Sequence, residues 1–147
     1  MDKIVVPDSN IFAKLLFQEG DSYVAKGFFE YCVINNITLV VPELFIYEIM
    51  SITQYYKGDM KKSISHIEAH KGVNLIISSP SLAMWQTAQK ISNAGHSKSG
   101  YPSMYDSIYH ALAIEGKGTF ITADKRHFSK TENQGHICLL ENWKSLF

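Results

Sequence analysis

The sequence of 147 residues predicts an α/β fold built on a mainly parallel sheet of roughly five strands. Short apolar, β-branched runs alternate with longer segments that have helical periodicity. The short runs are mostly apolar, which is typical of parallel strands covered by helices on both faces. Nothing repeats and no low-complexity segment marks a linker, so we expect a single domain over residues 1–147.

The strands are predicted from apolar runs that end at turn or capping residues. The first run ends in Pro7-Asp8-Ser9-Asn10, a cluster that is typical of the start of a helix. Gly116-Lys117-Gly118 separates a helix from the fourth run. The expected strands are residues 4–6, 38–41, 73–77, 119–122 and 136–140.

The helices are predicted where apolar residues recur at spacings of three and four. Asn35-Asn36 interrupts one such segment, and Pro42 suits the first turn of the next. Residues 93–103 form the one long polar loop, and no helix is predicted between Asp124 and the last strand. The expected helices are residues 11–17, 22–34, 43–56, 60–70, 80–92 and 104–115.

Composition limits the class of protein. Hydrophobic residues make up 46% and charged residues 19%, an ordinary globular balance, and no run is long enough to span a membrane. Cys32 and Cys138 form no CxxC pair, which favours a reducing, cytoplasmic location. The net charge of zero argues against a protein that coats nucleic acid, but allows an enzyme that holds it locally through metal and a few lysines.

Four acidic residues stand in apolar surroundings. Asp8 and Asp124 each follow a predicted strand closely, Glu48 lies within an apolar helix, and Asp106 opens another. Charges on apolar faces are costly unless they are paired or bound to metal. Because sites of parallel sheets form beyond the carboxyl ends of the strands, we expect these four side chains to converge at one sheet edge.

Each acid also has an ordinary interpretation. Asp8 could cap the helix that follows it, Asp106 could be a first-turn acid, and Asp124 could be a turn residue. Glu43 competes with Glu48 as the acid of its helix. Acids in a first turn simply favour the helix dipole, so Glu48 is preferred.

Electrostatics indicates what a cluster of these acids would need. Two carboxylates about 4 Å apart repel by roughly 4 kcal/mol at an effective dielectric constant near 20. No cysteine or histidine cluster accompanies the acids, so Mg²⁺ or Mn²⁺ fits better than zinc. Such an ion activates water and stabilises charge on a phosphate, which indicates phosphodiester chemistry. Ser9 and Thr122 are expected to support the ligating carboxylates through hydrogen bonds.

The sequence resembles the PIN domain family, and within it the VapC-like toxins. Order and spacing agree over essentially the full length, and the four acids show no departure from the family pattern. The residues that carry the resemblance are Val6-Pro7-Asp8-Ser9-Asn10, Pro42-Glu43-Leu44 with Glu48, the segment from Tyr105 to Ala113, and Thr122-Ala123-Asp124-Lys125-Arg126-His127-Phe128.

The resemblance implies a three-layer α/β/α fold and a single-strand-specific endoribonuclease that depends on Mg²⁺ or Mn²⁺. It implies RNA as the substrate, a small cognate antitoxin as a partner, a VapBC-type toxin–antitoxin pair, and a homodimer. It further implies that Ser9 or Asn10 and Thr122 support the site. The residues implied to hold the metal and carry catalysis are Asp8, Glu48, Asp106 and Asp124.

Three alternatives remain open at this point. A PIN-like domain could dock RNA or a protein without cleavage, or could be an RNA-processing nuclease that is not a toxin. A phosphoryl-transfer domain could use Asp8 as a nucleophile, but phosphatases of that kind need a second acid two residues later, where this chain has Asn10.

The histidines are interpreted as structural rather than metal-binding residues. His66 and His70 are four residues apart, but the HExxH signature is absent, so a solvated helix face is favoured. His110 is expected to pack in the core, and His127 to lie in a surface turn.

Overall fold

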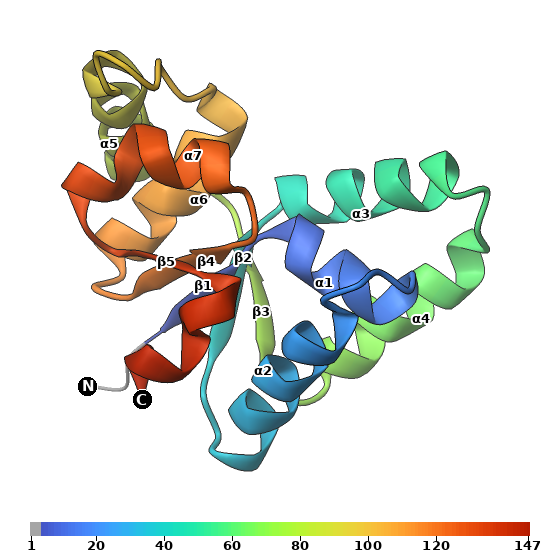
Figure 1. The fold of residues 1–147 in the computed structure, drawn as a ribbon. Coiled ribbons are helices and arrows are strands. Elements are labelled where there is room, and N and C mark those ends of the chain that lie inside the picture. The colour runs from blue at the N-terminus through green and yellow to red at the C-terminus, as the bar shows by residue number, and fades with distance from the viewer. Residues whose placement is uncertain (1–3) are drawn as a thin grey trace.

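The computed structural model describes residues 4–147, which contain a five-stranded, all-parallel sheet in the order β3-β2-β1-β4-β5 (Figure 1). This arrangement confirms the predicted α/β fold with a parallel, five-stranded sheet. The strands are β1 (Val5–Pro7), β2 (Leu39–Pro42), β3 (Leu75–Ser78), β4 (Thr119–Thr122) and β5 (Ile137–Leu139).

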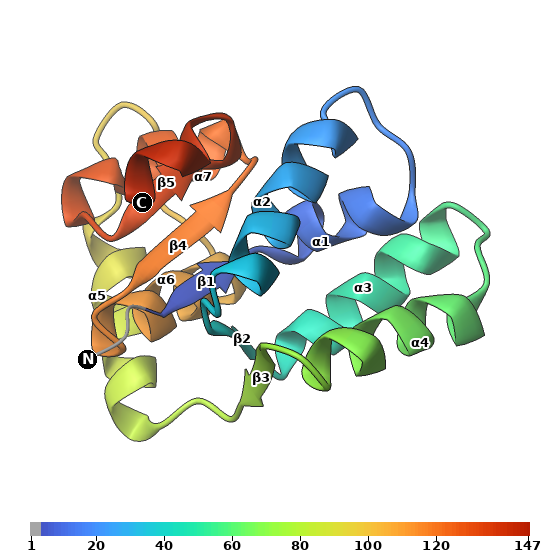
Figure 2. The same cartoon turned by 90° about the horizontal axis from the view of Figure 1, so that it is seen from below.

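Helices cover both faces of the sheet. Helices α5 and α6 pack together, and α6 contacts β1, β2 and β4, while α2 and the C-terminal 3₁₀ turns Leu140–Leu146 lie on the opposite face (Figures 1 and 2). Helices α3 and α4 run side by side and extend beyond the sheet. The helices are α1 (Ser9–Leu16), α2 (Ser22–Ile34), α3 (Leu44–Tyr55), α4 (Met60–Lys71), α5 (Leu82–Ala94), α6 (Met104–Glu115) and α7 (Lys125–Thr131).

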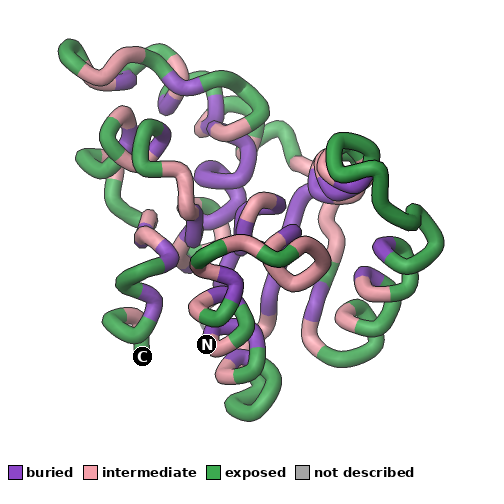
Figure 3. The backbone as a smooth tube through the Cα atoms, turned by 45° about the vertical axis from the view of Figure 1, so that its right-hand side comes forward, coloured by how far each residue is buried: buried purple, intermediate pink, exposed green. Residues whose placement is uncertain are grey.

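The core lies between the sheet and these helices, where β1, β2, most of β4 and the inner helix faces are buried (Figure 3). Aromatic rings connect its parts: Phe12 of α1 packs edge-on against Phe45 of α3 at 5.2 Å, and Tyr109 of α6 stacks on Phe120 of β4 at 5.6 Å. Burying one such side chain contributes about 1.5–3 kcal/mol. Among the described residues, none of the helices has the length and apolar character needed to cross a membrane.

The structure differs from the sequence-based expectation mainly after β4. Lys125–Thr131 forms α7, and Glu132–Gln134 adds a short 3₁₀ turn, where no helix was predicted. The third strand begins at Leu75 rather than at Val73. The shift follows from the turn that ends α4, in which the backbone N–H groups of Val73 and Asn74 both bond to the His70 carbonyl.

Gly118 allows β4 to begin directly beside β1. A Cβ atom at this position would lie 2.1 Å from the carbonyl oxygen of Ile4, so a larger residue would push the two strands apart. The pairing that follows aligns Val5 with Thr119 and Pro7 with Ile121. Strands β1 and β4 therefore end within one residue of each other, and the residues that follow them share one edge of the sheet.

Candidate active site

The first acid of the site, Asp8, lies where β1 ends and is held by hydroxyl groups. Its backbone N–H bonds to the carbonyl of Ile121 at 2.9 Å, which continues the β1–β4 pairing. Thr122 Oγ1 donates to Asp8 Oδ2 at 2.8 Å, and Ser9 Oγ donates to Asp8 Oδ1 at 3.3 Å. The Thr122 hydroxyl also accepts from the backbone N–H of Asp124 at 3.0 Å, so one side chain links two of the predicted acids.

Asp8 is a buried carboxyl group with other acids nearby. Its exposed fraction is 8%, and burial raises its pKa to about 7. The hydrogen bond from Thr122 opposes this shift, whereas the charges of Glu48 and Asp106 add to it. The acids of α3 and α6 therefore lie within electrostatic reach of the acid that ends β1.

Glu48 lies in α3 and receives a hydrogen bond from across the site. Tyr109 Oη of α6 donates to Glu48 Oε1 at 2.6 Å. Burial raises the pKa of Glu48, the Tyr109 bond lowers it, and the charge of Asp106 raises it further. Glu43 lies elsewhere: it is exposed at the start of α3 and accepts a hydrogen bond from Ser79 Oγ at 2.5 Å.

Asp106 lies in the first turn of α6, whose N-cap is Ser103. The cap hydroxyl accepts from the backbone N–H of Asp106 at 3.2 Å, which accounts for where the helix begins. Burial raises the pKa of Asp106, the charge of Asp124 raises it further, and the charge of Lys130 lowers it. His127 Nδ1 lies 3.9 Å from Asp106 Oδ2.

Asp124 follows β4 and caps α7. Its Oδ1 atom accepts from the backbone N–H groups of Arg126 at 3.0 Å and His127 at 3.1 Å. Asp124, which could have been a turn residue, is therefore the N-cap of a helix. The charge of Asp124 also raises the pKa of Asp106, so the capping residue lies within electrostatic reach of the other acids as well.

Three residues of this region were not predicted as part of a site. Tyr109 was included only in the segment that carries the family resemblance, although its hydroxyl bonds to Glu48; its position one turn after Asp106 is the signal that could have found it. The surface-turn prediction for His127 was wrong, because α7 buries its ring to 3% exposure. Lys130 of the same helix lies near Asp106 and had no sequence signal.

His110 and His70 pack against the interior of the fold. His110 is buried in α6 and bonds through Nε2 to the carbonyl of Gly135 at 2.6 Å, which confirms its place in the core. The solvated-face prediction was wrong for His70, whose ring packs edge-on against Phe12 at 5.1 Å and Phe29 at 5.8 Å.

The donor set fits a hard divalent cation. As placed, no three His, Cys, Asp or Glu side chains in residues 4–147 lie close enough together to share one ion. Burial nonetheless raises the pKa of Asp8, Glu48 and Asp106, and the charge of at least one other acid raises each of them further. Asn10 Oδ1 is buried without a hydrogen-bond partner in the described structure. Carboxylate, hydroxyl and amide oxygens are the ligands that Mg²⁺ and Mn²⁺ prefer.

Comparison with protein families matches residues 5–134 to the PIN domain. The chain belongs to the PIN domain family. Members of this family are typically nucleases and are commonly metal-dependent. A search of curated protein sequences found no match.

Solved structures share the fold of this PIN domain at low sequence identity. VapBC-1 from nontypeable Haemophilus influenzae is 17% identical with a TM-score of 0.68, covering 94% of this chain and 98% of that chain. VapBC2 from Rickettsia felis, bound to a promoter DNA fragment, is 15% identical with a TM-score of 0.67, covering 92% and 96%. VapC20 from Mycobacterium tuberculosis, a toxin that cleaves the sarcin-ricin loop, is 10% identical with a TM-score of 0.67, covering 90% and 95%.

Proposed function

We propose that this PIN domain is a Mg²⁺- or Mn²⁺-dependent endoribonuclease that hydrolyses phosphodiester bonds in single-stranded RNA. The observation that carries the proposal is electrostatic. Asp8, Glu48 and Asp106 come from three separate elements, the end of β1, α3 and α6. Burial nevertheless raises the pKa of all three, and the charge of another acid raises each pKa further. Grouped carboxyl groups with perturbed pKa values at a strand-end edge are typical of functional sites.

In this proposal the metal is held by Asp8, Glu48, Asp106 and Asp124, with Asn10 close by. When bound, the ion supplies an activated water and stabilises negative charge on the phosphate. The chain's own hydrogen bonds orient the carboxylates: Thr122 and Ser9 fix Asp8, and Tyr109 fixes Glu48. The hydrogen bond from the Asp124 backbone N–H to Thr122, which also bonds Asp8, helps to fix the positions of Asp8 and Asp124 relative to each other.

Substituting Asp8 tests the proposal. We expect Asp8→Asn to reduce metal-dependent cleavage of single-stranded RNA by about 100-fold or more, because a ligand should matter at least as much as the groups that orient it. Asp59→Asn is the matched control, since Asp59 caps α4 at the surface and accepts from the backbone N–H of Lys61. Full cleavage by Asp8→Asn, with its circular dichroism spectrum unchanged, would rule the proposal out.

A docking domain without cleavage makes a different prediction for metal binding. The nuclease proposal requires that calorimetric titration of the wild-type chain with Mn²⁺ shows a site that Asp8→Asn weakens. A docking module needs no such carboxylate-dependent site. Binding of RNA without a metal site would therefore favour docking, and we regard it as the outcome that separates the two classes.

We further propose that the chain is the toxin of a VapBC-type pair, with a small antitoxin as its partner, and that it self-associates as a homodimer. Two of the compared structures are VapBC complexes, and a third is a toxin–antitoxin complex from Klebsiella pneumoniae that is 14% identical with a TM-score of 0.66, covering 92% of this chain and 97% of that chain. Expression of the chain alone should arrest growth, and Asp8→Asn should abolish the arrest. A processing nuclease that is not a toxin would cleave RNA without this arrest.

A further inference from the structure

One cationic side chain lies beside the acids, on α7. Lys130 lies one helical turn after His127, whose Nδ1 atom is 3.9 Å from Asp106 Oδ2, and its positive charge lowers the pKa of Asp106. The remaining groups that act on the pKa of Asp8 and Glu48 are other acids and hydroxyl or amide hydrogen-bond partners. Lys130 is thus a positive charge at the rim of a negative cluster.

The stem of Lys130 lies against a closed turn. A Cβ atom on Gly100 would lie 3.8 Å from Lys130 Cε, an ordinary van der Waals distance. The turn is held by two reciprocal backbone hydrogen bonds of 2.8 Å between His96 and Gly100. His96 Nδ1 also accepts from the backbone N–H groups of Lys98 and Ser99. The end of the Lys130 stem therefore lies close to an ordered turn.

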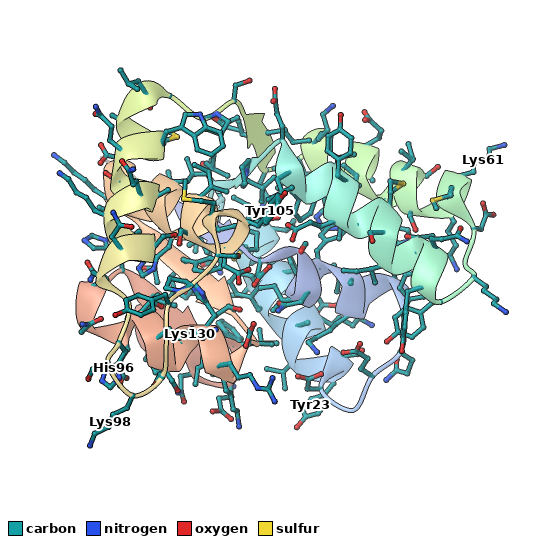
Figure 4. All side chains as sticks on the ribbon, turned by 90° about the horizontal axis from the view of Figure 1, so that it is seen from above. Tyr23, Lys61, His96, Lys98, Tyr105 and Lys130 are labelled. Atoms are coloured by element: carbon teal, nitrogen blue, oxygen red, sulfur yellow. The ribbon has the colours of Figure 1, made fainter. Side chains whose placement is uncertain are left out.

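The ammonium group of Lys130 forms no ion pair within residues 4–147. Among residues 4–147 no carboxylate lies within ion-pair distance of its ammonium group, whereas Lys125 on the same helix faces Glu141 at 3.9 Å. In Figure 4, Lys130 lies between the loop that carries His96 and Lys98 and the start of α6 at Tyr105. A partly buried lysine that has no internal partner is available to an anionic ligand.

An RNA strand would need such a charge at this place. The acids that bind the metal repel the phosphates on either side of the scissile one, and the chain as a whole has no net positive charge to offset this repulsion. Phosphate contacts position a nucleic acid without reading its sequence. One lysine at the rim supplies this contact without neutralising the ligand carboxylates.

We propose that Lys130 binds an RNA phosphate adjacent to the scissile one and thereby positions the strand over the carboxylate cluster. This inference rests on the proposed nuclease function. It assigns Lys130 to substrate binding and assigns no role in binding the metal. The loss should accordingly appear in RNA affinity and KM, with the Mn²⁺ affinity unchanged.

The test compares Lys130→Gln with Lys125→Gln, two variants that lose the same charge from the same helix. A fluorescein-labelled single-stranded RNA is titrated by fluorescence anisotropy at several salt concentrations in EDTA, which withholds the metal that the proposed cleavage requires. We expect Lys130→Gln to bind on the order of fivefold more weakly and to lower the salt slope by about 0.7, as for one lost phosphate contact on a single strand. Lys125→Gln should match the wild type, and Lys130→Arg should retain most of the affinity.

The two proposals can fail separately. If Lys130→Gln and Lys125→Gln have the same affinity and salt slope, or if the wild-type chain does not bind the RNA, the inference is overturned. The cleavage assay with unmodified RNA and Mn²⁺ reports on the nuclease function independently. A wild-type chain that binds RNA through Lys130 but does not cut it would leave this inference standing and remove the nuclease proposal.

Discussion

Asp8 is destabilising in the absence of a cation, and this cost can be measured. Its folded-state pKa is about 7, against an ordinary value of 3.8. Since the folded state holds the proton more tightly, stability falls as pH rises from about 4 to about 7. Above pH 7 the loss of folding stability is complete. A shift of three pKa units corresponds to at most about 4 kcal/mol of folding free energy.

We therefore predict that Asp8→Asn is more stable than the wild type at pH 7.5 in the presence of a chelator, and equally stable near pH 4. Urea denaturation at the two pH values measures the difference. Asp59→Asn should show no such pH-dependent gain, because Asp59 is exposed. A less stable Asp8→Asn at pH 7.5 would show that this carboxylate is compensated by protein groups alone.

Thr122 is the residue through which Asp8 and Asp124 are connected. Thr122→Val keeps the shape but removes the donor to Asp8 Oδ2 and the acceptor for the Asp124 backbone N–H. We predict that the Mn²⁺ concentration for half-maximal cleavage rises about 10- to 100-fold, with a stability loss of about 1–3 kcal/mol. Thr87→Val, which removes the hydroxyl that bonds Glu115 at the C-terminal end of α6, should leave the metal dependence unchanged.

At the scale of elements, α7 shows why part of the site could not be read from the sequence. The residues that α7 buries are His127 and Thr131, both polar, so the helix has no apolar periodicity. The burial of His127, the capping role of Asp124 and the position of Lys130 all depend on that helix. By contrast α6 was predicted with its observed bounds, since its buried face is mostly apolar and Ser103 caps it.

Contacts between segments far apart in the sequence were also not predicted. The sequence placed Asp8 and Thr122 at strand ends, and the shared edge follows from parallel pairing alone. The Tyr109–Glu48 bond joins residues 61 positions apart, so it depends on how α3 and α6 pack. No local pattern contains that information.

Asp124 is both a helix cap and a candidate metal ligand, and two substitutions can distinguish these roles. Serine caps helices well, so Asp124→Ser should keep the stability of the wild type and still lose metal-dependent cleavage. Asp124→Ala should lose cleavage and, in addition, about 0.5–2 kcal/mol of stability. Thermal unfolding and RNA cleavage on both variants give the comparison. Full cleavage by Asp124→Ser would limit Asp124 to its capping role.

At the scale of the whole molecule, strand order explains why the site lies where it does. The chain builds β1, β2 and β3 outward in one direction and then adds β4 and β5 on the other side of β1. The crevice at such a switch point is where open parallel sheets bind ligands. Asp8 follows β1 and Asp124 follows β4, so the two acids flank the switch point, and α3 and α6 bring Glu48 and Asp106 toward it.

The molecule also has an apolar surface next to this edge, formed by α3, α5 and the start of α6. Its side chains line a cavity of about 450 Å³ and include Tyr47, Trp85 and Tyr105, which are 75%, 47% and 66% exposed. Exposed apolar patches of this kind mark interaction sites. A second copy of the chain, as proposed above, would cover rings that are otherwise in contact with water.

We predict that the wild-type chain has twice its 16.6 kDa mass by light scattering, and that Trp85→Glu has the mass of one chain. A carboxylate placed in a buried apolar interface lacks a partner and costs several kcal/mol, enough to dissociate a modest dimer. Tyr55→Glu is the matched control, because Tyr55 is 81% exposed at the far end of α3, outside this surface. Equal masses for Trp85→Glu and Tyr55→Glu would mean that this surface does not join two copies. Since Trp85 lies in α5, which carries none of the four acids, a monomeric Trp85→Glu that still cleaves RNA would further show that each chain contains a complete site.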